Sequence, residues 1–90
     1  MISKEELPKH LESLRDAVEA KDGTRVALTA HTLKGMLANL SASHAADIAA
    51  QLERMGRNGE VAGYGEVFAN FERDAKNLLL ELADCMAGVS

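Results

Sequence analysis

The chain has 90 residues and a formal net charge of −4, with 47% apolar and 27% charged residues. This length makes one small domain with one modest core and no room for an enclosed active-site cavity. Because the basic residues are interspersed with acidic ones, a nucleic-acid partner is not expected. No apolar run reaches the roughly 18 to 20 residues of a membrane-spanning helix, so we expect a cytoplasmic protein without a membrane role.

Local propensity favours helix nearly throughout, because alanine, leucine and glutamate are the most frequent residues and only one proline is present. A first helix is predicted from a capping-box pattern at Ser3 and Glu6 to a stop signal at residues 21–23. Pro8 is tolerated near its start, although it leaves open a short extra N-terminal helix. The predicted inward side chains are Leu7, Leu11, Leu14 and Val18.

Two further helices follow at the same apolar spacing. Thr24 is predicted to cap the second helix, and either Ser41 or Ser43 can cap the third. Residues Asn58-Gly59 supply a left-handed stop for the third helix. The expected inward side chains are Val26, Ala30, Leu33, Leu37 and Leu40 in the second helix and Ala45, Ile48, Ala49, Leu52 and Met55 in the third.

The segment Gly63-Tyr64-Gly65 is interpreted as a connector before a last helix. The buried side of that helix is predicted to hold Val67, Phe68, Phe71, Ala75, Leu78, Leu82 and Met86. Four amphipathic helices joined by short links are typical of an antiparallel bundle. We therefore predict an all-α four-helix bundle that forms one domain over residues 1–90.

The second helix carries an unusual outward face within residues 30–40, AHTLKGMLANL. At about 100° per residue, His31 points roughly 140° away from the centre of the apolar stripe and is predicted to face solvent. Lys34 and Gly35 follow one turn later on the same side. Glycine costs a helix roughly 1 kcal/mol relative to alanine, so an exposed glycine without a packing need indicates close approach by another macromolecule.

These residue types together point to phosphoryl chemistry. A neutral imidazole is a good nitrogen nucleophile near pH 7, and a lysine one turn away can screen the oxygens of an incoming phosphoryl group. Taken alone, an exposed histidine beside a lysine is more often a solvated face. The sequence has no glycine-rich phosphate loop and no acidic magnesium cluster, so the phosphoryl group must come from elsewhere. His10 and His44 share no ligand spacing with His31, so no metal or cofactor site is expected.

Residues 30–35, AHTLKG, continued by residues 38–40, ANL, and Ala42, resemble the AHTLKGSSANLGA signature of the histidine-containing phosphotransfer (HPt) domain family. The likeness extends to residues 7–15 and to the third predicted helix at LE and GR, residues 52–53 and 56–57, and so covers most of the chain. The resemblance implies that His31 accepts and donates the phosphoryl group. It also implies that Lys34 lies near the phosphoryl oxygens and that Gly35 leaves room for the partner.

The function implied by the resemblance is that of a phosphorelay carrier and not of an autonomous kinase. The phosphoryl group would come from an aspartyl phosphate on a receiver domain, downstream of a hybrid histidine kinase, and pass to another response-regulator receiver. Mg²⁺ is expected on the receiver, and this chain is expected to be a monomer. The alternative is a non-catalytic helical interaction module, either a phosphorylation-dead relative of the family or an adaptor whose His-Lys-Gly face only binds a partner. The large Met36 keeps this option open.

In the family, a Gln or Glu at the position of Glu53 hydrogen-bonds the reactive histidine. A carboxylate that accepts the Nδ1 proton of His31 would leave the lone pair on Nε2. The alternative, which the sequence favours equally, is that Glu53 is a solvent-exposed acidic side chain on the third helix. The chain departs from the family pattern at Met36, Leu37 and Ser41. Leu37 is expected to be absorbed in the core, whereas Met36 fits either the core edge or a docking surface.

Overall fold

The computed structural model describes residues 6–40 and 42–89, with the side chains described as far as residue 80. Its elements are α1 (Glu6–Glu19), α2 (Gly23–Asn39), α3 (Ser43–Asn58), the 3₁₀ helix η1 (Val61–Gly63) and α4 (Tyr64–Val89). The described residues form helices without any strand. The prediction of an all-α four-helix fold is therefore confirmed.

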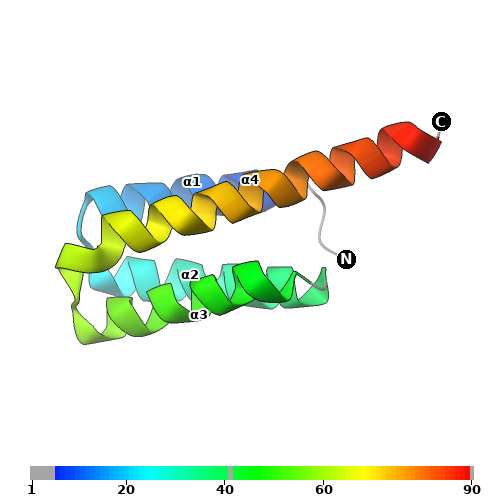
Figure 1. The fold of residues 1–90 in the computed structure, drawn as a ribbon. Coiled ribbons are helices and arrows are strands. Elements are labelled where there is room, and N and C mark those ends of the chain that lie inside the picture. Colours follow the sequence, from blue (N-terminus) through cyan, green and yellow to red (C-terminus); the bar gives the residue numbers. More distant parts are fainter. Residues whose placement is uncertain (1–5, 41, 90) are drawn as a thin grey trace.

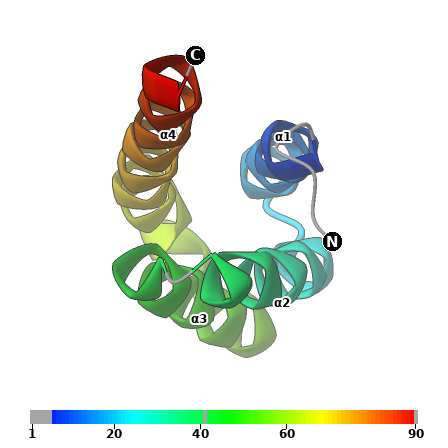
Figure 2. The same ribbon diagram turned by 90° about the vertical axis from the view of Figure 1, so that its right-hand side faces the viewer.

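Successive helices run in opposite directions, and the C-terminal part of α4 extends past the ends of the other three (Figure 1). Viewed along the bundle, α2 and α3 lie side by side, with α1 above α2 and α4 above α3 (Figure 2). The α2–α3 pair is the most closely packed of the helix pairs. Within the described ranges, no helix combines the length and apolar character that crossing a lipid bilayer requires.

The core is built from the predicted apolar stripes. The fully buried members of those stripes are Leu7, Leu11, Leu14, Val26, Ala30, Leu33, Leu37, Ala45, Ala49, Leu52, Phe68, Phe71 and Ala75. The half-buried ones are Val18, Leu40, Ile48, Met55, Val67 and Leu78. Met36 is buried as a core residue, so its long side chain fills space inside the bundle. The side chains of Leu82 and Met86 lie outside the described residues.

The N-terminal caps differ from the predictions at two helices. Asp22, and not Thr24, is the N-cap of α2, because its carboxylate accepts a hydrogen bond of 3.2 Å from the backbone N–H of Arg25. Lys21, with a φ of 56°, turns the chain so that α2 begins at Gly23, two residues earlier than a cap at Thr24 predicts. Ser43 is the first residue of α3, whose N-cap Ala42 makes no side-chain capping bond.

Other predicted helix ends have mixed outcomes. Gly59 ends α3 with a φ of 70°, as the Asn58-Gly59 pair predicts. Ser3, with its predicted capping box, lies outside the described residues, and so does Ser41.

The expected connector at residues 63–65 is wrong, because α4 begins at Tyr64. The Tyr64 ring is 1% exposed, and its hydroxyl donates to the Met55 carbonyl over 3.4 Å. Burial of this ring fixes a segment that its flanking glycines made look like a loop.

Backbone approaches backbone where α2 and α3 cross. An added Cβ at Gly56 would lie 2.7 Å from both the backbone N of Ala27 and the carbonyl oxygen of Gly23. At Gly23 it would lie 2.6 Å from the Gly56 carbonyl oxygen. Side chains at these positions would therefore force the two helices apart. Glu53 precedes Gly56 by one turn, so this contact sets the distance over which Glu53 can reach α2.

We predict that Gly56→Ala lowers the free energy of unfolding by about 1–3 kcal/mol, because the new methyl group meets rigid backbone atoms. Gly35→Ala is the matched control, since an added Cβ there meets nothing within 4 Å. It should raise the free energy of unfolding by up to about 1 kcal/mol through helix propensity. Urea unfolding followed by circular dichroism measures both. Equal effects of the two substitutions would contradict the close approach of α2 and α3.

Candidate functional site

His31 lies in the middle of α2 with its side chain 63% exposed. The apolar stripe of α2 faces the core through Leu33 and Leu37, which are fully buried, and this turns His31 toward solvent. The exposure agrees with the face predicted from the helical spacing. An imidazole so placed can meet a reactant that arrives from outside the bundle.

Glu53 on α3 is buried at 4% exposure and is the charged side chain that stands inside the described core. Its Oε2 lies 3.1 Å from Nδ1 of His31. Glu53 is therefore not a solvated acid, and its contact with His31 is the one that an orienting role would require. A carboxylate in this position needs partners, because burying an unpaired charge is costly.

Two cations complete the surroundings of the Glu53 carboxylate. Nζ of Lys34 lies 2.7 Å from Oε1, and a guanidinium nitrogen of Arg57 lies 2.6 Å from Oε2. The hydrogen bond from Lys34 and the charge of Arg57 hold the pKa of Glu53 below its ordinary value, although burial acts in the opposite direction. Glu53 is consequently ionised near neutral pH, accepts hydrogen bonds from His31 and Lys34, and forms an ion pair with Arg57.

The protonation of Glu53 fixes the tautomer of His31. An ionised carboxylate can only accept hydrogen bonds, so Nδ1 of His31 must be the donor. In a neutral imidazole the proton on Nδ1 leaves a lone pair on Nε2. The site therefore presents a fixed, exposed ring with a nucleophilic nitrogen.

Gly35 lies one turn after His31 on the exposed side of α2. Because an added Cβ would meet nothing within 4 Å, no neighbour in the described structure requires a glycine here. Ala38, the next residue along this face, is exposed. Ala27, one turn before His31, is buried, because Gly56 of α3 packs against its backbone.

Arg57 is the site residue that the sequence left without a role. Its spacing of four residues from Glu53 is the signal that could have indicated the ion pair. Lys34 lies one turn after His31 on α2, as predicted. Its ammonium group donates a hydrogen bond to Glu53, and the sequence alone did not indicate this contact. The changes at Met36 and Leu37 fall in the core, so they leave the surface around His31 unaltered.

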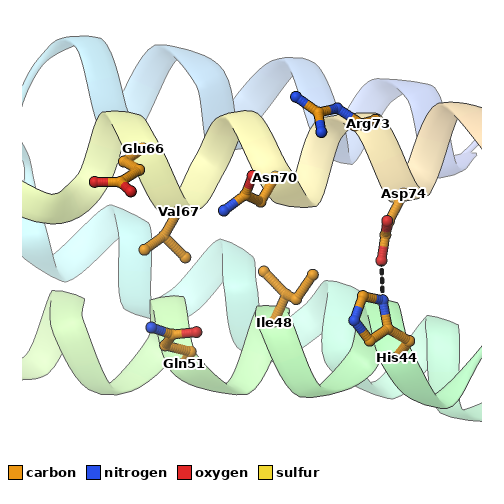
Figure 3. A pocket seen from close by; sticks show the side chains of 8 residues that line it. All are labelled: His44, Ile48, Gln51, Glu66, Val67, Asn70, Arg73 and Asp74. Carbon is orange, nitrogen blue, oxygen red and sulfur yellow. Dashed lines mark hydrogen bonds and ion pairs between the residues drawn. The ribbon is translucent and has the colours of Figure 1, made fainter.

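A polar groove lies elsewhere, between α3 and α4, and its volume is about 620 Å³ (Figure 3). It is lined by His44, Ile48, Gln51, Glu66, Val67, Asn70, Arg73 and Asp74. Nδ1 of His44 contacts the Asp74 carboxylate across this groove. His31 and Glu53 are not among the lining residues, so the groove is separate from the candidate site.

We predict that Glu53→Gln lowers the free energy of unfolding at pH 7 by about 1–2 kcal/mol, because the charged hydrogen bond from Lys34 and the ion pair with Arg57 are lost. Since folding lowers the pKa of Glu53, its ionic contribution is full above the ordinary glutamate range and is lost as the pH falls through the folded value. Urea unfolding at several pH values measures the difference between the two proteins. Glu60→Gln, at an exposed position, is the control and should change little. A difference that persists unchanged at pH 2–3 would contradict this account.

The comparisons with known proteins agree with this geometry. No curated protein and no solved structure gave a significant match. A family model described as the Hpt domain matches residues 2–90. Proteins of that family act as histidine phosphotransfer carriers in phosphorelays and interact with receiver domains and histidine kinases. Because the match spans nearly the entire chain, this protein belongs to the Hpt domain family.

Proposed function

We propose that this protein is a phosphorelay carrier in which His31 takes a phosphoryl group from an aspartyl phosphate on a receiver domain. His31 then passes the group to the receiver of another response regulator. The observation that carries the proposal is the 3.1 Å contact between Nδ1 of the exposed His31 and the buried Glu53 carboxylate. This contact occupies Nδ1, which supports Nε2 of the exposed ring as the nitrogen that would meet a receiver.

The transfer is a direct displacement at phosphorus. The Nε2 lone pair forms the new N–P bond while the P–O bond to the receiver's aspartate breaks, and the aspartate carboxylate leaves with the electron pair. Nδ1 keeps its proton, so the ring gains positive charge as the N–P bond forms. The Glu53 carboxylate, which contacts Nδ1, stabilises the positive charge of the ring. Transfer to the next receiver runs through the same groups in reverse.

Lys34 and Arg57 supply positive charge beside the reacting nitrogen. An ammonium group carries three donors and a guanidinium five, so each retains N–H groups beyond the one used on Glu53. We assign these remaining donors of Lys34 to the phosphoryl oxygens. A partly exposed cation near such oxygens is worth about 1 kcal/mol, which would modestly favour transfer and prolong the life of the phosphohistidine.

The reaction needs contributions that we assign to other proteins. Mg²⁺ is proposed to enter with the receiver and to neutralise phosphoryl charge there, because the Glu53 carboxylate is already engaged by His31, Lys34 and Arg57. An upstream hybrid histidine kinase is the proposed source of the phosphoryl group. The protein is proposed to act in the cytoplasm as a monomer and as a substrate and carrier, not as an autonomous kinase.

We predict that the wild-type protein acquires an acid-labile, alkali-stable label when it is incubated with phosphorylated receiver domains and Mg²⁺. His31→Gln should abolish the label, whereas His44→Gln, at an exposed histidine in the α3–α4 groove, should retain it. A wild-type protein that stays unlabelled with every receiver tested would support the interaction-module alternative. A label that survives in His31→Gln would place the acceptor elsewhere.

We predict that Gly35→Gln slows transfer from a receiver at least about tenfold without loss of stability, because the new side chain fills the approach beside His31. Gly65→Gln is the matched control, since an added Cβ at Gly65 also meets open space. The transfer rate and the urea unfolding midpoint are measured for both variants. A folded Gly35→Gln protein with the rate of the control would refute the access argument.

A further inference from the structure

The surface around His31 has two chemically different sides. On the side facing α3 lie Lys34 and, from α3 itself, Glu53 and Arg57. At 100° per residue, Leu28 and Gly35 lie about 60° and 40° around α2 from His31, in the direction opposite to Lys34. His31 therefore stands on the boundary between a charged side and a side made of apolar and small residues.

Leu28 is 65% exposed, and the other large apolar side chains exposed within the described residues are Val61 in η1 and Leu80 in α4. An exposed leucine alone is ordinary on a protein surface. Leu28 differs from the other two by its position one turn before His31. The position itself is what gives this leucine a candidate role.

Two further observations extend the apolar side. The Thr32 hydroxyl donates to the carbonyl oxygen of Leu28 over 3.2 Å, so its proton is already used inside the helix. The space over Gly35 is open. A partner that packs against this side can therefore contact Leu28. It would displace no side chain over Gly35 and would bury no unpaired hydroxyl donor at Thr32.

We propose that Leu28 is the apolar anchor of a docking face, formed by Leu28, His31, Thr32 and Gly35, that receives the receiver domain. This inference rests on the proposed function. A receiver that brings phosphorus to Nε2 must cover residues one turn away, because one turn of helix is only about 5.4 Å long. Leu28 therefore becomes buried whenever transfer occurs.

The two sides together set how the receiver is oriented. The anionic phosphoryl group and its surroundings are attracted to the side that carries Lys34 and Arg57. An apolar part of the receiver beside its phosphorylation site then meets Leu28, whose removal from water favours the complex. A receiver turned by half a revolution would place apolar surface on the cations, at a cost in desolvation.

The test compares Leu28→Gln with Leu80→Gln, because the two leucines are exposed to 65% and 64% and lie on different helices. Glutamine keeps a helix propensity close to that of leucine, so the helices should stay intact. The receiver used is one that exchanges phosphoryl groups with the wild-type protein. Leu28→Gln should raise the apparent KM for that receiver about five- to tenfold with little change in the maximal rate. Leu80→Gln should match the wild type, and Leu28→Met should restore most of the affinity.

A second donor separates this inference from the proposed function. Phosphoramidate, a small phosphoryl donor, needs no docking face, so it should label His31 equally in the wild type and in Leu28→Gln. An unchanged KM for the receiver in Leu28→Gln, or an equal rise in Leu80→Gln, would overturn the docking face while the carrier function stands. Absence of label on wild-type His31 with both phosphoramidate and receivers would overturn the proposed function and this inference with it.

Discussion

The Glu53 carboxylate, buried between α2 and α3, is the constraint on which the rest of the site depends. A buried carboxylate is tolerated only when donors replace the water it has lost. Here His31 and Lys34 supply the donors and Arg57 adds an ion pair, and all three side chains keep contact with solvent. The charge is thus paired at the edge of the core, where the desolvation cost is smaller than at its centre. The same pairing that makes the burial tolerable also holds the imidazole in one orientation.

The closeness of α2 and α3 is what allows this arrangement. Gly23 and Gly56 bring the two backbones together near the start of α2, and Glu53 precedes Gly56 by one helical turn. A wider spacing would lengthen the contact of 3.1 Å to His31 and weaken the orienting bond. Gly35, on the same helix as Gly23, has no such neighbour. Gly23 and Gly56 therefore allow two helices to pack closely, whereas Gly35 leaves open space on the surface of α2.

The bundle was predictable from the sequence because its helices carry apolar residues at regular spacing, and Leu14, Leu33 and Leu52 are buried as that spacing requires. Helix starts were less predictable, since Asp22 and Thr24 are both good capping residues and the left-handed Lys21 decides between them. Tyr64 illustrates a second difficulty. Its flanking glycines indicate a connector, yet tertiary burial of the ring overrides the local preference.

The candidate site was likewise predictable only in part, because some of its features are set by one helix and others by the contact between two helices. The exposure of His31 and the open space at Gly35 follow from the geometry of one helix, so a single sequence sufficed to predict them. The state of Glu53 depends on another helix, because a charged residue beside Leu52 is solvated unless α2 covers it. Arg57 shows the same limit: its spacing from Glu53 permits an ion pair, but many such pairs on exposed helices contribute little. The ion pair between Arg57 and Glu53 belongs to the site because Glu53 is buried beside His31.

This division has a consequence for how the protein can change. His31, Gly35 and Leu28 are exposed and contribute little to the core, so substitutions there can alter reactivity or partner choice at small cost in stability. Glu53 belongs to both the core and the site, and any substitution there disturbs the packing of α2 on α3 together with the orientation of the imidazole. The proposed docking face is therefore the part of this domain that can vary at small cost in stability, whereas the α2–α3 contact around Glu53 is constrained by folding.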